Sequence, residues 1–154
     1  GKTKSLDELP DGAVVAVPNN VTNEARALLL LEQEGIIKLK DDAGIKATAA
    51  DIVENPKNIT FQEIAPEQLV RALPDVDIAV INGNYAIEGG LHVKDALAVE
   101  SDQGIAAQTY ANIIAVRSED KDNEAVKKLI EVLKSDEIKQ FITDKYEGAV
   151  VPID

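Results

Sequence analysis

Short apolar runs bounded by turn residues alternate with amphipathic stretches along most of the chain. The run from Ala13 to Val17 is rich in β-branched residues and ends at Pro18, which predicts a buried strand. The stretch that follows repeats its apolar residues at helical spacing, which predicts a helix that either Thr22 or Asn20 caps and that runs to Gly35. The first part of the chain therefore indicates a strand, a loop and a helix in succession.

The middle of the chain repeats this arrangement with weaker signals. Alternation of apolar and polar residues predicts further strands, and short helical patterns lie between them. The expected strands are Ile36 to Lys40 and Asn58 to Ile64, and the expected short helices are Ala49 to Val53 and Pro66 to Leu73, the second with proline in its first turn.

A second strand, loop and helix unit begins at a fully apolar run from Val76 to Ile81. The turn residues Asn82-Gly83-Asn84 follow it, and Gly89-Gly90 ends the short helical turn after them. Later strands are expected at Ala96 to Val99 and at Ile113 to Val116. Strands that alternate with helices predict an α/β fold with a mainly parallel sheet flanked by helices on both faces.

Two helices are expected in the last part of the chain, within Asp120 to Glu147. One is amphipathic from Asp122 onward, and the other carries its apolar face up to Tyr146 before Gly148 ends it. Both apolar faces come after the helices of the sheet are accounted for. We therefore expect them to pack on a partner upstream of this sequence, and we predict self-association of the chain through these helices.

Composition narrows the possible functions. The 154 residues carry a formal net charge of −12, which argues against binding to nucleic acid or to an anionic membrane surface. Cysteine is absent, so the chain has neither disulfides nor thiolate metal sites. No apolar run reaches the roughly 18 residues that a membrane span needs, and no signal peptide or lipid anchor motif begins at Gly1.

Polar residues stand where three apolar segments end or are interrupted. In open α/β sheets, ligands bind outside the carboxyl ends of strands and beside helix N-termini, so these positions favour recognition of a small molecule. The segments are Val14 to Arg26, Asp77 to Tyr85 and Tyr110 to Arg117.

Arg26 lies near the start of its predicted helix, where a cation opposes the positive end of the helix dipole. One interpretation is that its guanidinium binds a ligand carboxylate through two hydrogen bonds. The other is an arginine paired with Glu24 or another acidic neighbour, and residue type alone favours this second interpretation.

The asparagines allow similar alternatives. Asn82 and Asn84 either form a simple turn or contact a ligand. Asn112 interrupts an apolar segment, so a buried amide there needs either a backbone partner or a ligand ammonium or carboxylate. The single histidine, His92, has no second histidine or cysteine at metal-ligand spacing. We expect no catalytic residue, no metal and no cofactor.

Taken together, the motifs resemble those of the methionine-binding lipoproteins, the NlpA/MetQ type of ABC-transporter substrate-binding protein. The likeness covers essentially the whole chain. It is carried by Lys4-Ser-Leu-Asp-Glu-Leu-Pro-Asp-Gly-Ala13, Thr22-Asn-Glu-Ala-Arg-Ala-Leu-Leu-Leu-Leu31, Val80-Ile-Asn-Gly-Asn-Tyr85, Asn112-Ile-Ile-Ala-Val-Arg117 and Gly148-Ala-Val-Val-Pro152.

The resemblance implies a type II periplasmic-binding-protein-like fold and a receptor that closes on a free amino acid, most simply L-methionine, without chemistry on the ligand. It implies an ABC permease and its ATPase as partners, and an extracytoplasmic protein that a lipid anchors to the membrane, with the anchor absent from this chain. Residues 1–112 then correspond to the second lobe, and residues 113–154 are the C-terminal return segment of a first lobe whose N-terminal half is missing.

The resemblance also implies roles for single residues. Arg26 binds the α-carboxylate, and Asn82 and Asn112 hold the carboxylate and the α-amino group. Asn23 and Tyr85 are candidates for the rim of the site.

Departures from the family pattern leave an alternative open. Asn19-Asn20-Val21 stands where Asn-Asp-Pro is usual, and the segment from Gly104 to Thr109 is longer than expected. These differences allow another amino acid or a dipeptide as ligand. The alternative function is a surface lipoprotein that acts mainly as a protein-interaction module with a vestigial ligand site.

Overall fold

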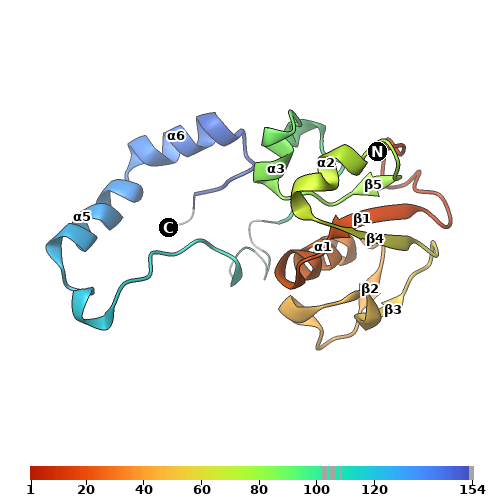
Figure 1. Cartoon of the computed structure of the whole chain (residues 1–154), viewed down its shortest axis with the longest axis horizontal. Coiled ribbons are helices and arrows are strands. Elements are labelled where there is room, and N and C mark those ends of the chain that lie inside the picture. Colours follow the sequence, from red (N-terminus) through yellow and green to blue (C-terminus); the bar gives the residue numbers. More distant parts are fainter. Residues whose placement is uncertain (102–103, 105–106, 108, 153–154) are drawn as a thin grey trace. The chain divides into compact units, whose positions relative to one another are not determined.

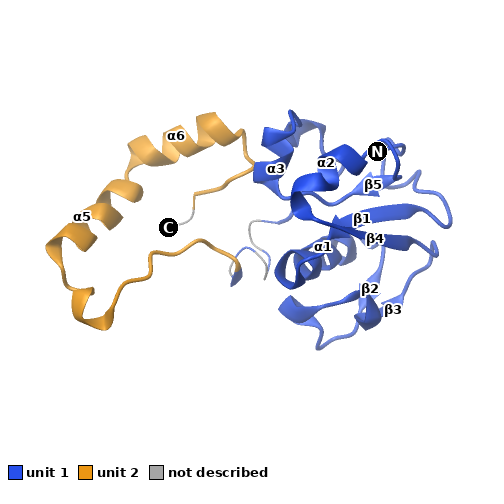
Figure 2. Ribbon diagram, viewed as in Figure 1, with its two compact units in different colours: residues 1–109 blue, residues 110–154 orange. Residues whose placement is uncertain are grey.

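A computed structural model of the chain describes residues 1–101, 104, 107 and 109–152. The chain divides into two units, residues 1–109 and residues 110–154 (Figure 2). The segment from Gly104 to Thr109, in which the sequence departs from the family pattern, lies partly outside the described residues.

A three-stranded parallel sheet forms the centre of the first unit (Figure 1). Its central strand β1 (Val14–Pro18) lies between β4 (Thr60–Ile64) and β5 (Ile78–Ala79). Because both pairings are parallel, the carboxyl ends of all three strands meet at one edge of the sheet. The strands predicted at Ala13 to Val17, Asn58 to Ile64 and Val76 to Ile81 are confirmed, although β5 covers only the middle of the last run.

Helices cover both faces of this sheet, as the alternation of strands and helices predicts. The α1 helix (Val21–Gln33) packs on the face that carries Val15 and Val17. The short α2 helix (Leu69–Ala72) packs on the other face through Leu69, next to Ala16. Successive residues of β1 therefore serve two separate cores, which explains why the strand is apolar at every position.

Local sequence fixes both ends of α1. The Asn20 side chain accepts a hydrogen bond from the Asn23 amide at 3.1 Å, so Asn20, and not Thr22, is the N-cap. At the other end Gly35 has a φ of 69°, and the Ile36 amide donates to the Leu31 carbonyl at 2.9 Å. This is a Schellman motif, which requires a left-handed residue where the sequence supplies glycine.

One predicted helix is wrong, because part of its segment belongs to a two-stranded antiparallel ribbon. The segment expected as a helix from Ala49 to Val53 forms only a single 3₁₀ turn, Ala49–Asp51, and then enters strand β3 (Ile52–Glu54). That strand pairs with β2 (Lys38–Leu39). The side chains of Thr48 and Asp51 close the turn as a capping box, after which two β-branched residues favour the extended conformation.

The strand expected at Ala96 to Val99 is wrong. A 3₁₀ turn, Val93–Asp95, precedes this segment, and the segment itself has no strand partner among the described residues. Val99 is instead held by the side chain of Gln33 on α1, whose amide donates to the Val99 carbonyl at 3.3 Å.

The second unit contains the two predicted C-terminal helices, α5 (Glu124–Leu133) and α6 (Asp136–Tyr146). Asn123 and Ser135 cap their N-termini through side-chain oxygens. After α6 the backbone turns left-handed at Glu147 and Gly148, so the helix ends where the glycine predicts.

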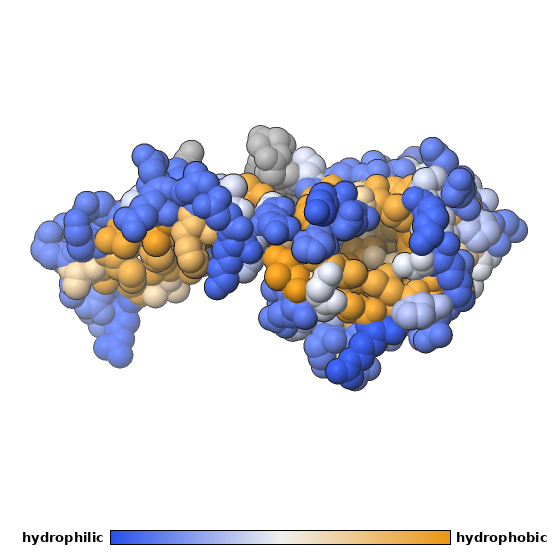
Figure 3. Space-filling view, turned by 90° about the horizontal axis from the view of Figure 1, so that it is seen from above, coloured by the Kyte–Doolittle hydropathy of each residue, from blue (hydrophilic) through white to orange (hydrophobic). Residues whose placement is uncertain are grey.

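The second unit has no core of its own, since none of the described residues between 110 and 152 is buried. Apolar side chains gather on the face of this unit that Figure 3 presents, and Leu129, Leu133 and Phe141 are 48%, 44% and 55% exposed. The strand expected at Ile113 to Val116 is wrong, because this segment is exposed coil with no neighbouring strand in the described part of the unit. An isolated apolar segment cannot satisfy its backbone as a strand without a partner.

None of the helices in the described part of the chain is both long enough and apolar enough to cross a membrane.

Candidate functional site

The carboxyl edge of the parallel sheet brings two of the candidate residues into contact. Asn23 lies in the first turn of α1, which follows β1, and Asn82 follows β5. The Nδ2 atom of Asn82 donates a hydrogen bond to Oδ1 of Asn23 at 2.9 Å. Residues 59 positions apart therefore meet, because β1 and β5 are neighbouring parallel strands.

Asn82 also stands at the start of α3 (Gly83–Glu88), where it is the N-cap residue, although its side chain does not cap the helix. The Oδ1 atom of Asn82 is buried and has no hydrogen-bond partner among the residues that the structure describes. Since Nδ2 is held by Asn23, the amide presents an acceptor to the site. A buried acceptor without a partner costs about 1–3 kcal/mol, which a ligand N–H group can recover.

Arg26 lies one turn after Asn23 on the same face of α1. Its Nε and Nη2 atoms donate to the two carboxylate oxygens of Glu100 at 3.1 and 2.5 Å. Both side chains are partly buried, at 32% and 25% exposed. The guanidinium thus already binds a carboxylate in the two-point manner expected for a ligand, and the acidic neighbour that residue type favours is Glu100, 74 positions away.

Tyr85 lies on α3, within one turn of Asn82, and its side chain is partly buried. Asn84, expected in a turn, instead lies exposed in the same helix. Position alone leaves Tyr85 a candidate for the rim of the site.

Asn112 belongs to the second unit, where it is exposed. The expectation of a buried amide in an apolar strand is therefore wrong for this chain. The reason is that the described part of this unit has neither a buried core nor a strand that the segment around Asn112 could pair with.

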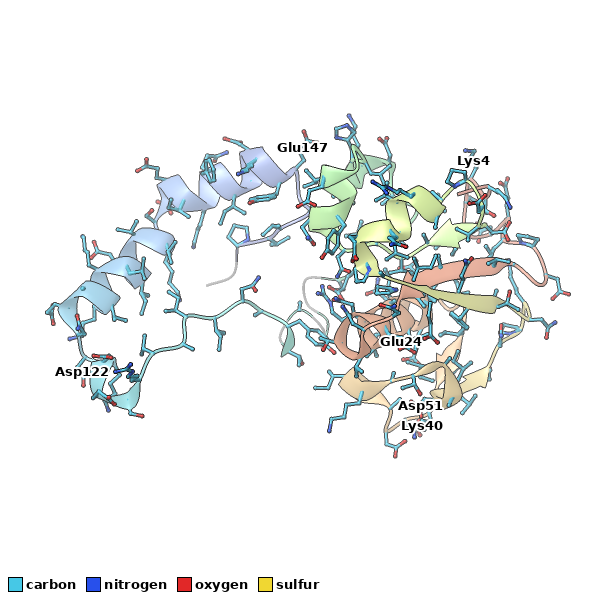
Figure 4. The ribbon with its side chains drawn as sticks, viewed as in Figure 1. Lys4, Glu24, Lys40, Asp51, Asp122 and Glu147 are labelled. Carbon is cyan, nitrogen blue, oxygen red and sulfur yellow. The ribbon has the colours of Figure 1, made fainter. Side chains whose placement is uncertain are left out.

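The sheet edge also carries negative charge. Burial, followed by repulsion from Glu63 on β4, raises the pKa of Glu24 in the first turn of α1. Away from this edge, Lys40 lies 2.9 Å from Asp51, and hydrogen bonds from Lys40 and Thr48 lower the pKa of the Asp51 carboxyl (Figure 4). Glu24 opposes anion binding at the helix N-terminus, which leaves Arg26 as the group that favours a carboxylate.

No group of three histidine, aspartate or glutamate side chains is placed to hold a metal ion within the described residues. His92 is exposed at the start of a 3₁₀ turn. The groups that face one another at the sheet edge are the amides of Asn23 and Asn82 and the ion pair of Arg26 with Glu100. Amides and a guanidinium bind polar groups through hydrogen bonds.

Sequence reasoning missed Glu100 as a member of this site. It directly follows the predicted strand Ala96 to Val99, so the rule that singled out the other strand ends also applies to it. The signal was present, but nothing in the local sequence connects Glu100 with Arg26.

Comparison with known proteins places this chain in a family. The family model described as NlpA lipoprotein matches residues 1–154. The chain belongs to the NlpA lipoprotein family. Among curated members, the D-methionine-binding lipoprotein MetQ of Escherichia coli K12 is 46% identical over 153 residues, which cover 97% of this chain and 55% of the relative. The methionine-binding lipoprotein MetQ of Bacillus subtilis 168 is 46% identical over 154 residues, with the same two shares.

Solved structures agree with this family assignment. A nutrient binding protein from Burkholderia cenocepacia, solved with bound methionine, has a TM-score of 0.85 at 51% identity, and the match covers 97% of this chain and 62% of that one. A periplasmic substrate-binding protein of an ABC transporter from Coxiella burnetii has a TM-score of 0.86 at 41% identity, covering 99% and 63%. The predicted periplasmic-binding-protein-like α/β fold is confirmed. The names of these NlpA relatives and neighbours also agree with a binding protein and not with an enzyme.

The chain spans about half the length of the curated NlpA relatives it matches, 53% to 56%. These relatives therefore contain residues that have no counterpart in this chain.

Proposed function

We propose that this chain is the ligand-recognising part of the substrate-binding component of an ABC importer, and that its ligand is a free amino acid, most simply L-methionine. The names of the MetQ relatives and of the methionine-bound neighbour support methionine as the ligand. The buried, unpartnered Oδ1 of Asn82 carries the proposal, because it needs a hydrogen-bond donor that the described residues do not supply.

The site offers complementary groups for both ends of an amino acid. Asn82 presents an acceptor for the α-ammonium group, and the Arg26 guanidinium is a donor for the α-carboxylate. Asn23 connects them, because it holds the Asn82 amide and lies one turn from Arg26 on α1. Tyr85 and Asn112 are assigned to the ligand only through the family resemblance.

We propose further that residues 1–112 form the second lobe of the receptor and residues 113–154 the return segment of the first lobe. None of the described residues of the second unit is buried, which supports this, since amphipathic helices without a core need another body to cover them. The complete receptor is expected to deliver its ligand to an ABC permease and its ATPase, and to be held outside the cytoplasm by a lipid anchor.

The test is a calorimetric titration of L-methionine into the protein encoded by the complete gene. We expect binding that Arg26→Ala weakens by about 30-fold or more, because truncating one partner of a desolvated charge pair costs at least about 2 kcal/mol. Arg71→Ala is the matched control, since Arg71 is an exposed arginine on α2 outside the proposed site, and it should leave the affinity unchanged.

Two results would count against the proposal. Unchanged affinity in Arg26→Ala removes the residue assignment. If titration with methionine, with other amino acids and with dipeptides gives no heat of binding, the receptor function is wrong. The alternative, a surface protein that acts mainly by binding other proteins, is then favoured.

A further inference from the structure

The contact between Glu100 and Arg26 has a specific geometry. Glu100 takes the edge of the guanidinium formed by Nε and Nη2, with one carboxylate oxygen on each nitrogen. A guanidinium has a second two-donor edge, formed by Nη1 and Nη2, to which another carboxylate can bind in the same plane. One arginine can therefore hold an internal carboxylate and a ligand carboxylate on different edges.

The backbone on either side of Glu100 is held by a residue other than Arg26. Both sequence neighbours of Glu100 are hydrogen-bonded to Gln33: the Gln33 amide donates to the Val99 carbonyl at 3.3 Å, and the Ser101 amide donates to Gln33 Oε1 at 3.0 Å. The Gln33 side chain thus makes the hydrogen bonds to the backbone on either side of Glu100 that a neighbouring strand would otherwise make.

Arg26 and Gln33 are seven residues apart on α1, which places them two turns apart on one face of the helix. Gln33 fixes the backbone of residues 99–101, and the Glu100 side chain reaches back along the helix to Arg26. Both partners of the Arg26–Glu100 contact are thus held by α1, Arg26 as a residue of the helix and Glu100 through Gln33.

We infer that Glu100 is a positioning residue for the ligand carboxylate: it fixes the Arg26 guanidinium before the ligand arrives, and Gln33 fixes Glu100. This inference rests on the proposed amino-acid receptor. A free arginine side chain samples many rotamers and loses that freedom on binding, whereas an arginine already held on one edge loses little more. Affinity for the carboxylate therefore rises without any contact between Glu100 and the ligand.

The test compares two ligands in the protein encoded by the complete gene. L-methionine carries the carboxylate that Arg26 binds in the proposed site, and L-methioninol replaces that carboxylate by an alcohol. We expect Glu100→Ala to lower the affinity for L-methionine by about tenfold, a loss similar to that for residues that orient metal ligands. The affinity for L-methioninol should be unchanged. Gln33→Ala should lower the affinity for L-methionine by a smaller factor and also leave the affinity for L-methioninol unchanged. Glu100→Gln keeps an acceptor oxygen, so its affinity for L-methionine should lie between those of Glu100→Ala and the parent protein.

A second readout needs no ligand. In ¹H–¹⁵N spectra of the parent protein, the Arg26 Nε–H signal should exchange slowly with water because Glu100 accepts from it. In Glu100→Ala it should exchange fast, while Arg71 serves as the reference for an exposed arginine.

The outcomes separate this inference from the proposed function. Higher affinity for L-methionine in Glu100→Ala overturns it, because Glu100 then competes with the ligand. Equal losses for both ligands also overturn it, because the role is then structural. If the parent protein binds no amino acid, the proposed function fails, and a fast-exchanging Arg26 signal in that parent overturns the held guanidinium as well.

Discussion

The orientation of one side-chain amide decides what the proposed site can recognise. Asn82 donates through Nδ2 to Asn23, and its buried Oδ1 acceptor has no hydrogen-bond partner among the described residues. An acceptor binds an ammonium group and repels a carboxylate. The family resemblance alone lets Asn82 hold either group, and the contact with Asn23 favours the ammonium.

This assignment leads to a prediction at the residue scale. Asn82→Ala should weaken L-methionine by about tenfold or more, since a hydrogen bond to a charged group is worth about 1.5–3 kcal/mol. The desamino analogue of methionine, which lacks the ammonium, should bind the parent and the variant with equal affinity. Titration calorimetry of the four combinations gives the coupling between Asn82 and the ammonium directly. Equal weakening of both ligands would contradict this role for Asn82.

At the scale of the element, α1 carries most of the site and depends on one core side chain. Leu28 is fully buried between the helix and the face of the sheet that carries Val15 and Val17. Leu28→Ala should lower the free energy of unfolding by about 2–5 kcal/mol, because it removes buried methyl groups and leaves a cavity. Urea denaturation followed by circular dichroism measures this loss.

Val21→Ala is the matched control for Leu28. Val21 begins the same helix but is 68% exposed, so its truncation should change the free energy of unfolding by no more than about 0.5 kcal/mol. Similar losses in the two variants would show that α1 is not anchored through Leu28.

At the scale of the whole molecule, the described residues of the second unit form no core, so apolar side chains on its helices are exposed. Leu129 and Leu133 lie one turn apart on α5 and are both nearly half exposed. We expect copies of the chain to associate through these exposed apolar side chains at high concentration. The formal net charge of −12 opposes association, so the effect should grow as salt screens the repulsion.

Sedimentation velocity over a range of salt concentrations tests this expectation. The double variant Leu129→Lys and Leu133→Lys should shift the chain toward monomer, whereas Lys134→Gln, at an exposed position that follows the same helix, should not. A monomer at high concentration and high salt in the parent chain would contradict the prediction.

The features that the sequence predicted well depend on residues close together along the chain. The glycine at position 35 ends α1 as the sequence predicts, and the β-branched run identified β1. For the N-cap the sequence offered Thr22 or Asn20, two residues apart, and the structure shows Asn20. Predictions failed where an element depends on a distant partner, as for the strands expected at Ala96 to Val99 and Ile113 to Val116. An apolar run becomes a strand only if another strand satisfies its backbone, and local pattern does not carry that information.

By itself, the sequence determined the family, the alternating α/β pattern and the polar residues at the strand ends, because periodicity, caps and motifs are local properties. Tertiary structure alone decided that Asn82 turns its donor toward Asn23, and that Arg26 pairs with Glu100 across 74 positions. Parallel pairing of β1 with β5 and packing against α1 bring these residues together. Their contacts depend on three-dimensional distance, which a single sequence does not specify.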